Sequence, residues 1–82
     1  MNHVYRKELL TNALDARIRE VTEYQVNIDN FRLAIEACLK QSDMHDFREQ
    51  LESLLRSSIS EQRKAQIMLD VIRQQLEAED VG

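Results

Sequence analysis

The residues of this 82-residue chain that could carry out chemistry are few and widely separated. It has one cysteine, Cys38, and two histidines, His3 and His45. A nucleophilic cysteine needs a neighbouring base and hydrogen-bond donors for the developing oxyanion. His45 could serve Cys38 as a base, but the only glycine is Gly82, so no glycine-rich turn accompanies them. We therefore expect no catalytic residues and no enzymatic activity, and interpret Cys38 as a small hydrophobe of the core.

A metal site is equally poorly supported by the sequence. Zinc sites in proteins need three or four ligands that converge on one point. The close acidic neighbours of His45 are Asp43 and Asp46, and no further histidine lies nearby. Glu77 and Glu79 add carboxylates near the C-terminus without any sign of a surrounding pocket. We predict no metal site and no cofactor.

The composition is that of long, solvated helices. Charged residues make up 32% of the chain, and proline is absent. The formal net charge is −4 and the pI is near 5.1. Nucleic-acid binding draws on clustered Lys and Arg that neutralise phosphates, whereas the cations here are scattered among acids. We expect no direct nucleic-acid binding.

The same residues bear on localisation. No apolar run approaches the roughly 18 to 20 residues that span a bilayer, so we expect no membrane insertion. Residues 1–8 lack the apolar core of a signal peptide. A single cysteine cannot form an intramolecular disulfide, which suits a reducing compartment. We expect a cytoplasmic protein.

Apolar residues in the first half recur every three or four positions, which predicts a helix over about residues 4–40. From Val21 onward these steps alternate strictly between three and four, the pattern of a coiled-coil seam. The predicted seam residues are Leu10, Leu14, Ile18, Val21, Tyr24, Ile28, Phe31, Ile35 and Cys38.

The periodicity is interrupted near the chain midpoint, which predicts a turn at about residues 41–43 and a second helix over about 43–79. The predicted seam residues of the second helix are Met44, Phe47, Leu51, Leu54, Ser58, Gln62, Ala65, Leu69, Ile72 and Leu76. Two helices of matching length predict a single all-α domain, residues 1–82, folded as an antiparallel two-helix hairpin. Glu77, Glu79 and Asp80 lie where the helix dipole disfavours anions, so we expect a frayed C-terminus.

The middle of the second helix leaves an alternative open. Ser57, Ser58 and Ser60 are polar where a seam needs apolar residues, and Ser58 with Glu61 has the spacing of a capping box. A break near residue 58 would give three helices. Because no Gly or Pro enforces a stop, we favour one continuous helix.

Several aliphatic residues fall outside both predicted seams, and a helix with two apolar stripes needs two neighbours. We therefore expect homo-oligomers in a helical bundle, or docking on another protein. The candidate partner-binding residues are Val26, Leu33, Ile59, Ile67 and Val71.

Two segments carry a resemblance to a known family. Residues 5–10, YRKELL, and residues 20–31, EVTEYQVNIDNF, resemble the lysis-inhibition accessory protein of T-even-type bacteriophages, the cytoplasmic antiholin. The resemblance implies a small cytoplasmic regulatory protein, encoded by a phage, that binds the cytoplasmic segment of a holin. Together with a periplasmic antiholin, such a protein delays host lysis. The resemblance assigns no functional residue to this chain.

Two other functions fit the same residues. A phage-encoded inhibitor of a host enzyme or defence complex would dock its acidic surface on a basic groove, and salt would weaken that binding strongly. A structural coiled-coil module would self-associate tightly and bind no other partner.

Overall fold

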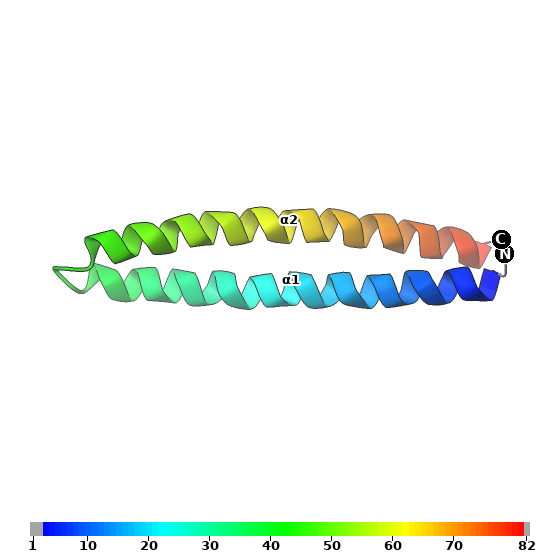
Figure 1. Cartoon of the computed structure of the whole chain (residues 1–82), viewed down its shortest axis with the longest axis horizontal. Coiled ribbons are helices and arrows are strands. Elements are labelled where there is room, and N and C mark those ends of the chain that lie inside the picture. The colour runs from blue at the N-terminus through cyan, green and yellow to red at the C-terminus, as the bar shows by residue number, and fades with distance from the viewer. Residues whose placement is uncertain (1–2, 82) are drawn as a thin grey trace.

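The chain folds as two long antiparallel helices that lie side by side (Figure 1). The computed structural model describes residues 3–81. Helix α1 covers His3–Leu39 and helix α2 covers His45–Val81, with 37 residues in each. The turn between them, residues 40–44, lies at one end of a rod of 62 × 17 × 13 Å, and both termini lie at the other. The predicted all-α hairpin is confirmed.

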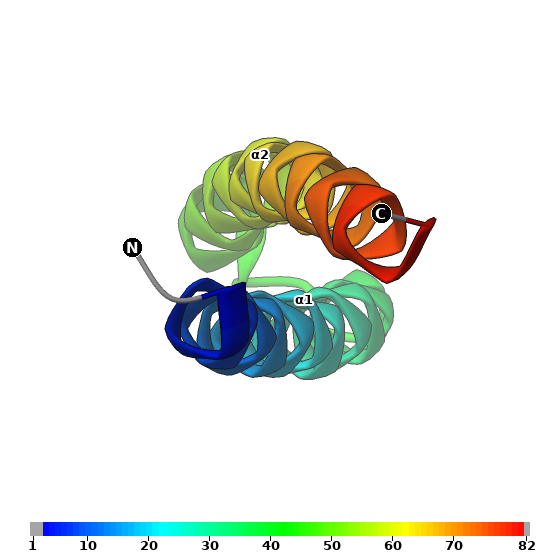
Figure 2. The same ribbon diagram turned by 90° about the vertical axis from the view of Figure 1, so that its right-hand side faces the viewer.

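The helices meet along one continuous seam. On each helix the seam residues are buried or half-buried and follow one another in alternating steps of three and four. On α1 they are Leu10, Leu14, Arg17, Val21, Tyr24, Ile28, Phe31, Ile35 and Cys38; on α2 they are Arg48, Leu51, Leu55, Ser58, Gln62, Ala65, Leu69, Ile72 and Leu76. This heptad pattern makes helices wind around each other, and the end-on view shows them crossing (Figure 2).

The predicted seam of α1 was wrong at Ile18, which is 43% exposed. Arg17 takes the position because the seven-residue repeat, continued back from Val21, reaches residue 17. The Nε atom of Arg17 is buried, while its Nη2 atom lies 3.1 Å from a carboxylate oxygen of Glu20. The aliphatic part of this side chain therefore fills the seam and the charged end reaches the surface.

The predicted seam of α2 was wrong in its first turns. Leu54 is 49% exposed, and Leu55 is half-buried in its place. Met44 and Phe47 are also exposed, and Arg48 occupies the first seam position of α2. The prediction chose Phe47 and Leu54. The strict heptad repeat instead places the next residue along, Arg48 or Leu55, on the seam.

The alternative break near residue 58 is not supported, because α2 is one continuous helix. Ser58 is half-buried on the seam within it. One turn later, Gln62 Nε2 donates hydrogen bonds across the seam to the Val21 carbonyl, 3.1 Å away, and to Gln25 Oε1, 2.8 Å away. Its amide is thus satisfied inside the hairpin without ending the helix.

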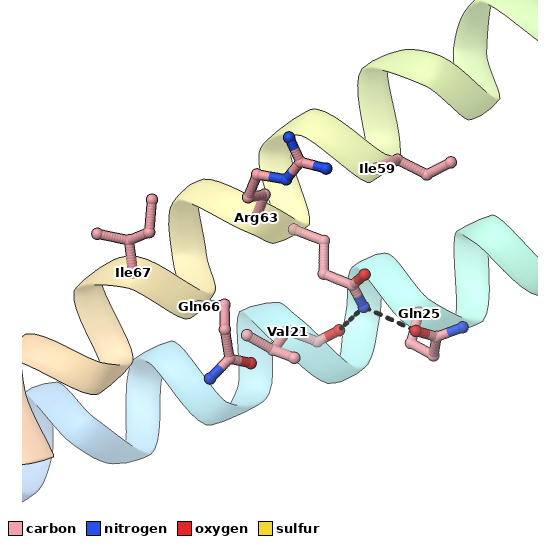
Figure 3. Close-up of a pocket in the computed structure, with 7 residues that line it drawn as sticks. Val21, Gln25, Ile59, Arg63, Gln66 and Ile67 are labelled. Atoms are coloured by element: carbon pink, nitrogen blue, oxygen red, sulfur yellow. Dashed lines mark hydrogen bonds between the residues drawn. The ribbon is translucent and has the colours of Figure 1, made fainter.

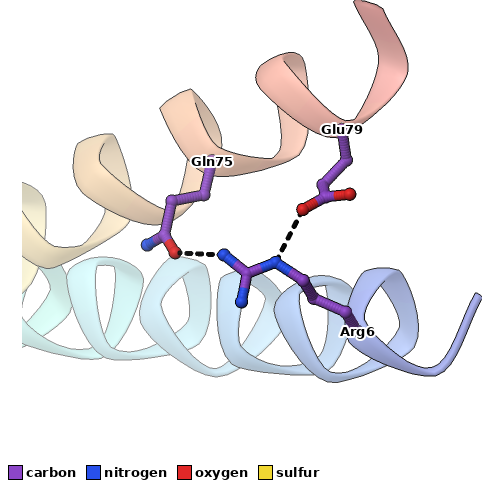
Figure 4. A network of polar contacts seen from close by, with 3 residues as sticks. All are labelled: Arg6, Gln75 and Glu79. Carbon is purple, nitrogen blue, oxygen red and sulfur yellow. Dashed lines mark hydrogen bonds and ion pairs between the residues drawn. The ribbon is translucent and has the colours of Figure 1, made fainter. Parts of the chain in front are cut away.

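Helix α2 stays helical through its last described turn, and the fraying of the C-terminus stays a prediction. Arg6 of α1 lies opposite this turn (Figure 4). Its Nε atom donates to Glu79 Oε1 over 2.6 Å, and its Nη2 atom donates to Gln75 Oε1 over 3.2 Å. Lys7 pairs with Asp80 in the same way. Cations from α1 thus compensate the carboxylates that oppose the dipole of α2.

The core that results is thin. Six of the described hydrophobic residues are buried, namely Ile28, Cys38, Leu51, Ala65, Leu69 and Ile72. Ile28 is the most deeply buried, at 2% exposure. All six lie in the single layer between the two helices, so the hairpin has no second layer to compensate for damage to this one.

We predict that Ile28→Asp unfolds the chain, because a buried carboxylate without a partner costs several kcal/mol, which is comparable to the whole stability of a small domain. Val26→Asp is the matched control, since Val26 is 53% exposed two residues away. Circular dichroism during thermal unfolding should show loss of helix at room temperature for Ile28→Asp alone. Similar melting of both variants would show that the seam is assigned wrongly.

Candidate interaction surface

Open grooves lie along the seam of the described surface. One of them has a volume of about 500 Å³ and is lined by Val21, Gln25, Ile59, Gln62, Arg63, Gln66 and Ile67 (Figure 3). Its polar lining is mainly amide, and the Gln62 amide is already bonded to α1. The groove brings no acid and base together, so it has no arrangement for catalysis.

The conceivable pair of Cys38 and His45 lies at the turn, where both residues line one groove with Arg48. Cys38 is buried, in agreement with its predicted place in the core. His45 Nδ1 lies 3.2 Å from Arg48 Nη2, which can only donate, so Nδ1 accepts. Its Nε2 atom lies 3.1 Å from Glu49 Oε1. Both ring nitrogens are thus engaged on α2, and neither is directed to Cys38.

The first turn of α2 also holds a group of possible metal ligands. His45, Asp46 and Glu49 each place one ligand atom within 4.8 Å of the others, and all three are exposed. Sequence reasoning missed Glu49, although its spacing of four residues from His45 indicates a shared helix face. Exposed acidic groups of this kind are common at helix starts, where the dipole favours them.

The candidate partner-binding residues are placed as follows. Val26 and Leu33 are exposed on α1, and Ile67 and Val71 are exposed on α2. Ile59 is half-buried at the groove beside Gln62. The structure does not gather the five in one patch: Val26 and Leu33 are two turns apart on α1, whereas Ile67 and Val71 are adjacent turns of α2.

A broader apolar surface was missed by sequence reasoning. On α2, Phe47, Leu54 and Met68 recur at multiples of seven residues, so they share one row. Val71 lies next to Met68 at a spacing of three residues. These four side chains are between 42% and 49% exposed. They form a ridge of bulky residues along one side of the hairpin, which we call the ridged face.

The half of the ridged face that α1 contributes is built from small residues. They are Ala13, Ala16, Ala34 and Ala37, half-buried or exposed. The hydrogen bonds from Gln62 to α1 and from Arg6 to α2 fix the antiparallel register. In that register the first two alanines are level with Met68 and Val71, and Ala37 is level with Phe47, whereas Leu54 is level with Asn30, one turn from Ala34. The ridged face therefore has a low strip of alanines on α1 beside the raised strip of bulky residues on α2.

The middle of the ridged face is charged. Glu20, Glu61, Lys64 and Met68 line one shallow hollow there, together with Arg17. Lys64 Nζ lies 2.9 Å from Glu61 Oε1, and the Lys64 side chain is 69% exposed. Glu23, one turn from Glu20, is also exposed. Two apolar areas are thus separated by a charged band.

The total surface is large for a chain of this size. A compact monomer of 9.7 kDa is expected to expose about 5,100 Å², whereas this chain exposes 6243 Å². Thirteen of the described large hydrophobic residues are exposed, whereas four are buried, namely Ile28, Leu51, Leu69 and Ile72. The elongated hairpin therefore exposes more surface than a compact monomer of its mass and leaves many of its large hydrophobic residues exposed to solvent.

Comparison with known proteins finds no matching family model, no similar curated protein and no similar solved structure. Within residues 3–81, neither helix contains a segment both long and apolar enough to cross a membrane.

We predict that Gln62→Ala lowers the free energy of unfolding by about 1 to 2 kcal/mol, because it removes two hydrogen bonds across the seam. Gln66→Ala is the control: Gln66 is exposed and bonds Asp70 of its own helix, 3.0 Å away, so its loss should cost under about 0.5 kcal/mol. Urea titration followed by circular dichroism measures both. Equal effects would show that the bonds across the seam add no stability.

Proposed function

We propose that this chain is a regulatory interaction protein, which acts by binding another protein molecule through its apolar helical surface. The observation that carries the proposal is the excess of exposed over buried large hydrophobic residues. In water such surface is unfavourable by about 25 cal/mol per Å², so covering it drives association. The grooves along the seam offer no converging catalytic groups, which favours a surface function over catalysis.

Part of this surface points away from the seam and is suited to a partner's helix. Val26 and Leu33 lie seven residues apart on α1 and are 53% and 64% exposed. Amphipathic helices bind such rows through anchors at matching helical spacing. Arg19 continues the same seven-residue row, and Lys40 follows it as the first residue of the turn, so both ends of the row are basic. This row would therefore favour a helix that carries aliphatic anchors and acidic ends.

We propose the partner from the resemblance to the cytoplasmic antiholin of T-even-type phages. It would be the cytoplasmic segment of a holin, and binding it in the host cytoplasm would delay lysis. The support for this partner is the resemblance of residues 5–10 and 20–31. Val26 lies within the second of these segments, and Leu33 lies two residues beyond it.

The test is a lysis assay in bacteria that express a T-even-type holin and its endolysin. We predict that co-expression of this chain delays the onset of lysis, and that the Val26→Gln, Leu33→Gln variant loses the delay. The variant should keep its helical content, because neither residue lies on the seam.

Asn12→Gln is the matched control, since it alters the same row of α1 without removing an apolar anchor. It should delay lysis as the unaltered chain does. If the unaltered chain, expressed at the same level as the holin, does not delay lysis, the holin is not its partner. A full delay by the Val26, Leu33 variant would place the binding site elsewhere.

A further inference from the structure

We propose that the ridged face is covered by a second copy of this chain, related to the first by a two-fold axis parallel to the long axis of the hairpin. The two hairpins would form a four-helix bundle with both turns at the same end. This inference rests on the proposed function and deepens it, because it names one protein that covers the apolar surface.

The area of the ridged face is sufficient for a stable dimer. The hairpin is 62 Å long and 17 Å across, so one such face offers roughly 1,000 Å². Each partner of a standard protein interface buries about 800 Å². A second hairpin laid along the full length would also remove much of the surface excess of the single chain.

The shape of the ridged face complements itself in this arrangement. The two-fold axis places α2 of one copy on α1 of the other and keeps each residue at its own level along the rod. The ridge residues Met68 and Val71 then meet Ala13 and Ala16 of the second copy. Farther along, Phe47 meets Ala37 in the same way, and Leu54 meets Asn30, with Ala34 one turn away. Bulky side chains thus pack against small ones, as tight helix packing requires.

The central band contributes one contact between opposite charges. Lys64 lies level with Glu20 and Glu23, so the Lys64 ammonium of one copy faces these two carboxylates of the other, while it also pairs with Glu61 of its own copy, 2.9 Å away. Lys64 is 69% exposed and can reach across an interface. Each such contact occurs twice, because a two-fold interface is isologous.

The competing arrangement has the two-fold axis across the rod, at its middle, with the turns at opposite ends. It would place α2 on α2 and α1 on α1. Ridge would then meet ridge, and Glu20 and Glu23, near the middle of α1, would face their own copies. Lys64 would lie level with both Glu61 and Lys64 of the second copy. The facing carboxylates on α1 and the bulky rows on α2 disfavour this arrangement.

In the proposed dimer, Val26 and Leu33 stay on the outside of the bundle, because their row on α1 points away from the seam. The dimer therefore leaves them free for a partner, and it presents that row twice.

Sedimentation equilibrium tests the face. The unaltered chain should have twice the mass of 9.7 kDa. The Ala16→Arg, Ala37→Arg variant should sediment as a monomer that keeps its helix signal, since arginine is a good helix former. The control Asn12→Arg, Ser53→Arg adds the same charge on rows away from the face and should stay dimeric. A monomeric unaltered chain, or a dimeric alanine variant, would overturn the proposal.

A second variant covers the case in which the arginine variant fails to fold. Lys64→Glu alters an exposed side chain, so the hairpin persists, and it sets a carboxylate against Glu20 and Glu23 of the other copy. Its dimer should dissociate at least about tenfold more readily. Unchanged dimer affinity would contradict the proposed charge contacts.

Distances between spin labels test the orientation. A label on Ser42→Cys, in a Cys38→Ala background, marks the turn. With both turns at one end, the two labels should lie at a separation far below the 62 Å length of the rod, because neighbouring helices are about 10 Å apart. A separation close to the full length would overturn the proposed axis. That result would not contradict the proposed function, since a second copy would still cover the ridged face in the other orientation. A confirmed dimer that does not delay lysis would instead contradict the holin as partner.

Discussion

The structure depends on one seam, in which the side chains of two helices alternate over the full length of the rod. Every buried residue of the described chain lies in it, and Ile28 and Leu69 have no second layer of protein behind them. A two-helix hairpin cannot surround its core, because each helix presents only one side to its neighbour. The opposite sides therefore face solvent, and the proposed function rests on their composition.

The seam is also imperfect in a way that shapes the surface. Arg17, Arg48 and Gln62 occupy seam positions, and each is accommodated by an aliphatic stem or by a hydrogen bond across the helices. These positions contribute less apolar burial than leucine would. Leu54 and Met68, by contrast, lie outside the seam and are exposed to solvent. Leucine outside the seam and glutamine within it are the pattern expected of a chain whose outer residues become buried in an assembly, as proposed above.

Much of the fold follows from the sequence, because the heptad steps, the lack of proline and the interruption at mid-chain all indicate a hairpin. Cys38 and Ile28 were placed correctly for the same reason. The errors at Ile18 and Leu54 came from preferring hydrophobicity to spacing: the repeat, counted back from Val21, reaches Arg17. The ridged face could not be predicted in this way. It requires the register of α1 against α2, which the turn and the bonds of Gln62 and Arg6 set, and which no local pattern contains.

The central claim is that one seam is insufficient and that association completes the core. The most direct measurement is the midpoint of thermal unfolding, followed by circular dichroism, at protein concentrations from about 1 to about 100 µM. If two copies share a bundle, unfolding is coupled to dissociation and the midpoint should rise by several degrees over this range. A midpoint that does not change with concentration would show that the hairpin is stable alone and would contradict the claim.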